Sequence, residues 1–166
     1  MLEICRNFHY ICLSDNYEIM AYDISIKLPQ GWVSDLDSYL DESGVEITHL
    51  SCHLPNDRKQ TDEALIDAYV GPMPEDTTAA DQALANYADT VGFDDDDPED
   101  FDPIIEWPFN GKKAYGFEAL AEDDSPMRMM CYEPKKGILV ILVVLAKDDD
   151  TLVEAVQLAE RGLRLK

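Results

Sequence analysis

The sequence of 166 residues lacks the short patterns by which catalytic sites are most readily recognised. It has no glycine-rich phosphate loop of the G-x-x-x-x-G-K or G-x-G-x-x-G type, no G-x-S-x-G elbow and no H-E-x-x-H helix. The sequence therefore offers no candidate catalytic residue and no candidate cofactor site. We expect a protein that is more a binding module than an enzyme.

Long hydrophobic runs are also missing. The longest uninterrupted apolar segment is the nine residues from Ile138 to Ala146, well below the roughly 20 that a membrane helix needs. The first residues combine neither a basic flank nor a sustained apolar stretch, as a secretory signal would. We therefore expect no membrane insertion and a cytoplasmic location.

Cysteine is scarce and shows no C-x-x-C pair, so we expect reduced, mostly buried thiols at Cys5, Cys12, Cys52 and Cys131. Two groups of thiols and imidazoles are zinc-ligand candidates by residue type: Cys5, His9 and Cys12, and His49, Cys52 and His53. On a strand, side chains two or four residues apart share a face, so His49 and His53 lie together while Cys52 points away. The spacing therefore argues against a closed zinc site. No local pattern supports a cysteine–histidine nucleophile pair either.

Positive charge is in short supply, with 13 Lys and Arg against 35 Asp and Glu. The basic residues cluster only at Lys112-Lys113 and Lys135-Lys136. Because nucleic-acid binding depends on a basic surface, we expect no nucleic-acid partner.

What the chain does contain is a regional excess of acid. Between Ser34 and Glu106 there are 21 acidic side chains and two basic ones, which accounts for −19 of the net charge of −22. The excess peaks between residues 94 and 102, in the run DDDDPEDFD. A field of this sign repels phosphates and anionic lipids and attracts basic proteins or hard cations.

Calcium binding is one alternative for this acidic run, because Ca²⁺ takes several oxygen ligands from a flexible loop. Asp94, Asp96 and Pro98 stand at the first, third and fifth positions of an EF-hand-like spacing. However, Glu99 occupies the sixth position, where that loop requires glycine, and Ile105 occupies the twelfth, where it requires glutamate. A solvated acidic loop that acts through its charge is the simpler interpretation.

The pattern of apolar residues predicts alternating strands and helices. We expect strands over 10–13, 22–28 and 45–54, a short helix between Ser34 and Gly44, and a helix capped by Thr78 and Asp81. Hairpins are predicted over 104–120 around Asn110-Gly111 and over 127–145 around 134–137, followed by a helix after Asp148. The segment 138–145 is apolar throughout and should be a central strand covered on both faces.

Three segments carry further expectations. Residues 64–70 alternate and favour a strand that pairs back as a hairpin, with a helix beginning at Thr61 as the alternative. Met127, Met129, Met130 and Cys131 are expected to fill a core beneath a helix rather than to form an adaptable binding face. Trp107 stands next to Pro108, which indicates an edge strand and makes this tryptophan a candidate docking anchor beside the acidic run. The alternative, and the more common outcome for such a residue, is a partly buried structural tryptophan.

The order of elements resembles the PsbP-like fold, which is named for an extrinsic subunit of photosystem II and is shared with Ran-binding nuclear import factors. Three cues carry the resemblance across residues 17–165: the strand that ends in Pro29 and Trp32, the segment 112–117 after an Asn-Gly turn, and the final strand and helix over 137–165. The resemblance implies the same fold. Because members of that fold act mainly by binding proteins, it also implies an interaction role, and it supplies no catalytic or binding residue to carry over.

Together these observations predict a single α/β domain over residues 1–166, an α/β/α sandwich with a mostly antiparallel β-sheet. The expected function is that of a non-catalytic, soluble, acidic protein whose acidic face binds a basic protein partner. The predicted partner-binding residues are Asp94, Asp95, Asp96, Asp97, Glu99, Asp100, Asp102 and Trp107. The alternatives are a small-molecule or Ca²⁺-binding domain, including an enzyme of unknown reaction, and an acidity that serves solubility alone. The sequence leaves the oligomeric state open.

Overall fold

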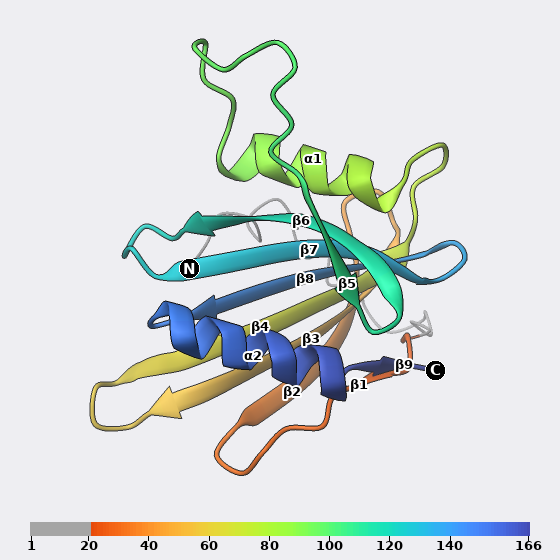
Figure 1. Ribbon diagram of the computed structural model, residues 1–166. Coiled ribbons are helices and arrows are strands. Elements are labelled where there is room, and N and C mark those ends of the chain that lie inside the picture. Colours follow the sequence, from red (N-terminus) through yellow and green to blue (C-terminus); the bar gives the residue numbers. More distant parts are fainter. Residues whose placement is uncertain (1–20) are drawn as a thin grey trace.

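The computed structural model describes residues 21–166, which form a seven-stranded antiparallel sheet with two helices (Figure 1). The strand order is β2-β3-β4-β8-β7-β6-β5, and a separate two-stranded ribbon pairs β1 with β9. The strands of the main sheet are β2 (Val33–Leu40), β3 (Glu46–Asn56), β4 (Thr61–Pro72), β5 (Ile105–Phe109), β6 (Lys112–Leu120), β7 (Pro126–Lys135) and β8 (Ile138–Ala146). The ribbon consists of β1 (Ile24–Ser25) and β9 (Arg164–Leu165), and the helices are α1 (Ala79–Thr90) and α2 (Asp149–Gly162).

The two helices pack on opposite faces of the sheet, as strand β8 shows. Val140, Leu142 and Val144 belong to the buried cluster that includes residues of α2. The intervening Leu139 and Val143 belong to the cluster that includes residues of α1. Because successive side chains of a strand point to opposite faces, the two clusters lie on the two sides of the sheet. The predicted α/β sandwich with a mostly antiparallel sheet is thus confirmed.

Strand β8 is the central strand of seven, as its unbroken apolar sequence predicts. Beside it, β4 pairs antiparallel with β3 on its other edge, so the strand interpretation of residues 64–70 is confirmed and the helix alternative is wrong. Both later hairpins form as predicted, with Asn110 and Gly111 in the left-handed conformation that a tight turn requires.

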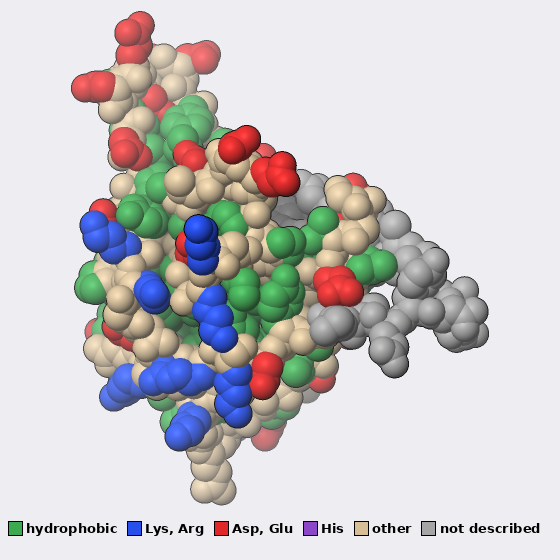
Figure 2. Space-filling model, turned by 90° about the vertical axis from the view of Figure 1, so that its right-hand side faces the viewer, with side chains coloured by type: hydrophobic (Ala, Val, Ile, Leu, Met, Phe, Trp, Pro, Cys, Tyr) green, Lys and Arg blue, Asp and Glu red, His purple; other side chains and the backbone are tan. Residues whose placement is uncertain are grey.

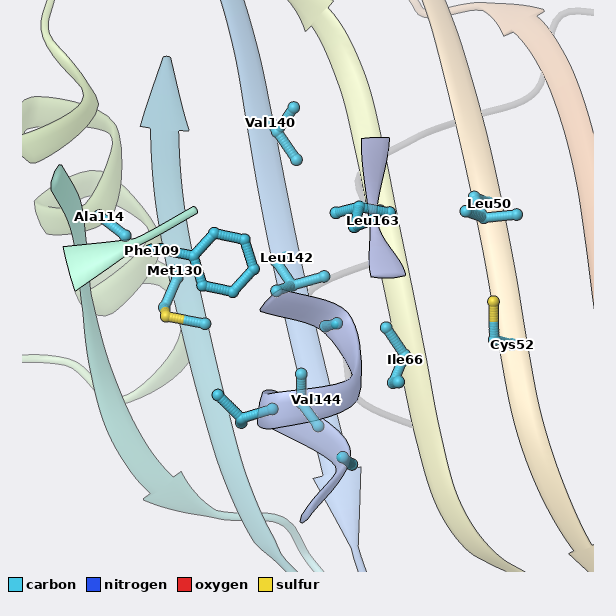
Figure 3. Packing of buried hydrophobic residues seen from close by; sticks show 14 of the residues in the cluster. Leu50, Cys52, Ile66, Phe109, Ala114, Met130, Val140, Leu142, Val144 and Leu163 are labelled. Atoms are coloured by element: carbon cyan, nitrogen blue, oxygen red, sulfur yellow. The ribbon is translucent and has the colours of Figure 1, made fainter. Parts of the chain in front are cut away.

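Figure 3 shows the core on the α2 side, where side chains of β3, β4, β8 and β7 point toward the helix. Met127, Met129, Met130 and Cys131 are each at most 1% exposed, so the methionine-rich strand is a core strand, as expected. Met127 and Met129 belong to the α1 cluster, whereas Met130 belongs to the α2 cluster.

The predicted helix between Ser34 and Gly44 is wrong, because Val33–Leu40 is strand β2. Every residue of this segment pairs with β3, from Val33 opposite His53 to Leu40 opposite Glu46. The helical spacing of Leu36, Tyr39 and Leu40 has no counterpart in the packing, since Leu36 is 50% exposed. Pairing along the edge of the sheet therefore outweighs the local capping pattern.

Two further expectations differ from the structure or lie outside it. The strand predicted over residues 22–28 shortens to β1, because its partner β9 offers only two residues for pairing and was not anticipated. The strand predicted over residues 10–13 lies outside the described residues, as do Cys5, His9 and Cys12.

Candidate functional site

The most prominent surface feature is the acidic loop, residues 92–104, which projects from the body of the molecule between α1 and β5 (Figure 1). Helix α1 ends in a turn in which the backbone N–H groups of Val91 and Gly92 both donate to the carbonyl of Tyr87. Gly92 has a φ of 82°, which redirects the chain away from the helix axis. The local sequence thus sets the direction in which the loop leaves the helix.

Short-range hydrogen bonds shape the acidic loop. The N–H of Asp97 donates to the carbonyl of Asp94 at 3.0 Å, and the N–H of Asp94 donates to Oδ2 of Asp97 at 2.8 Å. Farther along, Phe101 N–H donates to the Pro98 carbonyl at 2.9 Å, and Ile104 N–H donates to Oδ1 of Asp102 at 3.0 Å. These turns hold the loop in a defined conformation, which reduces the entropy that a partner must remove on binding.

Aromatic rings connect the base of the acidic loop to the hydrophobic core. Phe117, buried in β6, makes an edge contact with Tyr87 of α1 at 5.2 Å between ring centroids. Tyr87 contacts Phe93 at 5.2 Å, and Phe93 contacts Phe101 at 6.5 Å. Phe93 and Phe101 are nevertheless 49% and 41% exposed. The loop therefore presents two supported aromatic side chains among its carboxylates.

All seven acidic residues predicted to bind a partner lie on this loop, and six of them are exposed, Asp97 being half-buried. Figure 2 shows red side chains on the projecting part of the surface. Among the described residues, none of these seven carboxylates forms an ion pair with a Lys or Arg side chain of the same chain. Their charge is therefore available to a partner.

Trp107, the eighth predicted partner-binding residue, lies on strand β5 and not on the acidic loop. It is half-buried on β5, packed against the cluster under α2, and the guanidinium of Arg128 lies 4.6 Å from the centre of its ring. Arg128 in turn donates from Nε to Glu118 at 2.9 Å. The exposed aromatic residues beside the acid are Phe93 and Phe101, which the sequence analysis did not single out. The sequence signal that could have identified them is their position at the two ends of the acidic run DDDDPED.

A second group of polar side chains lies on strands β3 and β4, on the sheet face opposite α2. Nε2 of His49 lies 2.9 Å from Oδ1 of Asp67, and the His49 ring stacks on Tyr69 with centroids 4.2 Å apart. Asp67 is the one buried carboxylate among residues 21–166, at 8% exposure. The contact with Asp67 orients the imidazole of His49.

Cys52 does not serve that role, because it projects from β3 to the α2 face, away from His49 and His53, and is fully buried. Burial, together with the nearby charge of Asp67, raises the pKa of the Cys52 thiol to about 11. The thiol is thus protonated at neutral pH and unreactive. Within residues 21–166, no three His, Cys, Asp or Glu side chains are placed to hold a metal ion.

An open hollow of about 500 Å³ lies where the β6–β7 turn approaches the start of α2. Apolar atoms of Leu120, Leu152 and Val153 line it together with the paired Glu118 and Arg128. Of the charged residues that line the hollow, Glu118 and Arg128 pair with each other, and Asp149 at the start of α2 is the third.

Comparison with known proteins adds little to this description. No known protein family matches the chain, and no curated protein matches it. One solved structure, the extracellular domain of PknH from Mycobacterium tuberculosis, aligns with 84% of this chain and 80% of its own at 13% identity and a TM-score of 0.26. A TM-score this low is no evidence of a shared fold, and the resemblance to the PsbP-like fold stays a prediction. No helix among the described residues is long and apolar enough to cross a membrane.

Proposed function

We propose that this protein is a non-catalytic interaction protein whose acidic loop binds a basic protein partner. The observation that carries the proposal is the combination, on one structured projection, of two exposed phenylalanines with carboxylates that pair with no Lys or Arg among residues 21–166. Acid that served solubility alone would need neither the hydrogen-bonded turns nor the aromatic support from Tyr87 and Phe117.

The charges and the rings of the loop would contribute differently to binding. Exposed ion pairs contribute only about 0.2–1 kcal/mol each, and their main effect is to steer and accelerate the encounter. Desolvated aromatic side chains supply much of the affinity in protein interfaces. The rings of Phe93 and Phe101 also offer faces to which Lys or Arg side chains of the partner are attracted.

The test is an affinity capture from lysate of the native host at low salt with three matched baits. The first is the unaltered protein, and the second, the loop variant, carries Asn or Gln in place of the seven loop acids. The third, the control variant, loses seven exposed acids elsewhere and therefore has the same net charge: Asp57, Asp62, Asp76, Asp89, Glu122, Asp124 and Glu154.

A basic protein captured by the unaltered protein and the control variant, and lost with the loop variant, supports the proposal. Capture that is equal with all three baits contradicts it, and so does capture that weakens equally in both variants, because the effect would then follow net charge and not the loop.

Kinetics of the captured partner separate the two contributions. We expect the loop variant to slow association and to lose most of the salt dependence of the association rate. Phe101→Ala should leave the association rate nearly unchanged and raise the dissociation rate by about tenfold, which corresponds to roughly 1.4 kcal/mol. Surface plasmon resonance at two salt concentrations measures both rates.

A further inference from the structure

The structure gathers basic residues that are scattered in the sequence into one surface, here called the basic end. It combines the β5–β6 and β7–β8 hairpins with the C-terminal segment that follows α2. The members are exposed Lys and Arg side chains: Lys27, Lys112, Lys113, Lys135, Lys136, Arg161, Arg164 and Lys166. Figure 2 shows this concentration of blue side chains below the acidic projection.

Specific contacts hold the parts of the basic end together. Nδ2 of Asn110, at the β5–β6 turn, donates to the carbonyl of Leu163 at 3.3 Å. The N–H of Lys27 donates to the carbonyl of Gly162 at 3.2 Å. The ring of Phe109 contacts Tyr132 on β7 at 5.0 Å between centroids, which ties the first hairpin to the second. The basic end is therefore part of the folded structure and not a flexible tail.

Most of this positive charge is available to a partner. Within the described part of the chain, Lys27, Lys112, Lys135, Lys136 and Lys166 form no ion pair. Lys113 is paired with Glu106 at 3.2 Å, on a side chain that is 70% exposed. The basic end can attract an acidic segment that comes close to it, although the chain as a whole has a net charge of −22. That net charge repels a long polyanion such as a nucleic acid.

The acidic loop of the same chain is an exposed acidic segment, but it points away from the basic end. The acidic loop projects beyond α1, whereas the basic end lies at the hairpin tips and the C-terminus (Figures 1 and 2). We infer that the basic end of one molecule binds the acidic loop of a second copy, in a head-to-tail contact. The inference rests on the proposed function, because it names the basic end of a second copy as one basic surface that the acidic loop binds.

Salt affects the head-to-tail contact in two opposite ways, because it screens both the repulsion between whole molecules and the attraction between the loop and the basic end. At low ionic strength, two molecules of charge −22 repel each other over long distances. At about 0.15 M salt the Debye length is about 8 Å, so the long-range repulsion is screened while close ion pairs persist. High salt weakens those pairs as well. Self-association should therefore be strongest at intermediate ionic strength.

Sedimentation velocity over a range of protein concentrations, at low, intermediate and high NaCl, tests the inference. We expect the average mass to rise with concentration at intermediate salt and to return to that of the monomer at both extremes. The loop variant has a smaller net charge and, by general repulsion alone, would associate more strongly than the unaltered protein. The head-to-tail contact predicts the opposite, a monomer.

Two turns offer a matched pair of variants for the basic side. Lys135→Gln with Lys136→Gln removes two charges from the basic end, and Arg58→Gln with Lys59→Gln removes two from the β3–β4 turn. Antiparallel pairing of β4 with β8 places these turns at opposite ends of the sheet. The first pair should weaken self-association about 2- to 30-fold, since exposed ion pairs contribute about 0.2–1 kcal/mol each. The second should leave it unchanged.

Mixing provides the decisive control. The loop variant keeps its basic end, and the Lys135/Lys136 variant keeps its loop. An equimolar mixture should therefore form mainly a 1:1 dimer, at lower concentrations than either variant needs to associate with itself. A protein that stays monomeric at every salt concentration, or a loop variant that associates as well as the unaltered protein, overturns the inference. If the three-bait capture still depends on the loop, the inference fails and the proposed function stands; if it does not, both fail.

Discussion

His49 and Asp67 form an isolated polar contact between neighbouring strands. Asp67 is 8% exposed, and its carboxylate lies 2.9 Å from the imidazole of His49. Replacing Asp67 with Ala removes the partner of a largely buried imidazole, which should lower the free energy of unfolding by about 1–3 kcal/mol. Asp67→Asn keeps one acceptor oxygen and should cost less. Urea denaturation measures both, and equal stabilities of the unaltered protein and the alanine variant would show that the contact contributes nothing.

The buried Cys131 thiol gives the protein a dependence on alkaline pH. Burial raises its pKa from 9.0 to about 12 in the folded state. The thiol of the unfolded chain ionises near its ordinary value, so the unfolded state binds fewer protons above pH 9. The stabilisation is complete below the ordinary pKa and is lost as the pH rises toward 12, by up to about 1.4 kcal/mol per pH unit.

The measurement is urea denaturation with reductant at pH 8, 9, 10 and 11. Cys131→Ala should be less stable at pH 8, because it leaves a cavity, but should lose less stability between pH 9 and 11 than the unaltered protein. An identical pH dependence in the two proteins would rule out this origin of the effect.

Single residues also show where sequence reasoning fell short on the candidate site. The exposure of the loop acids to solvent could be predicted from the sequence, because a run of like charges stays in solvent. The orientation of Trp107 could not, since it depends on Arg128 from a neighbouring part of the sheet. Phe93 and Phe101 interrupt the acidic run at its ends, but their support by Tyr87 and Phe117 becomes visible only when α1 is docked on β6.

Among the secondary-structure elements, the pairing of β6 with β7 imposes the tightest steric requirement. A Cβ atom at Gly116 would lie 1.8 Å from the carbonyl oxygen of Met129. Because the obstacle is backbone, Gly116→Ala should cost about 3 kcal/mol or more in the free energy of unfolding. Gly44→Asn is the control: this glycine has a φ of 77°, which Asn tolerates, and open space around it. Comparable loss in both variants, by thermal or urea denaturation, would contradict the steric argument.

Elements with strong local signals were predictable, and those that depend on distant partners were not. The Thr78–Asp81 capping box, the Asn110-Gly111 turn and the apolar β8 each identify their element within a few residues of sequence. Strand β2 carries a helix-like spacing and is held in place by β3. Strand β9 is two residues long and exists through its pairing with β1. The sequence of β2 or of β9 alone does not reveal the strand with which it pairs.

At the scale of the whole molecule, folding places the acidic loop and the basic end on different parts of the surface, although basic residues are scattered along the sequence. The acid between residues 94 and 102 is contiguous in the chain, so its role as a surface was foreseeable. The basic end is assembled from segments far apart in the sequence, which meet because the Asn110 turn contacts the end of α2. In the described part of the chain, the acidic loop and the basic end thus form two separate charged surfaces in a protein of net charge −22.

The most direct test of the central claim is the affinity of the captured basic partner for the unaltered protein, the loop variant and the control variant, measured by titration calorimetry at physiological salt. A surface formed by the acidic loop predicts a Kd at least about tenfold weaker for the loop variant, or roughly 1.4 kcal/mol, and a nearly unchanged Kd for the control variant of equal net charge. Equal affinities of all three proteins would contradict the claim and place the partner-binding surface elsewhere on the molecule.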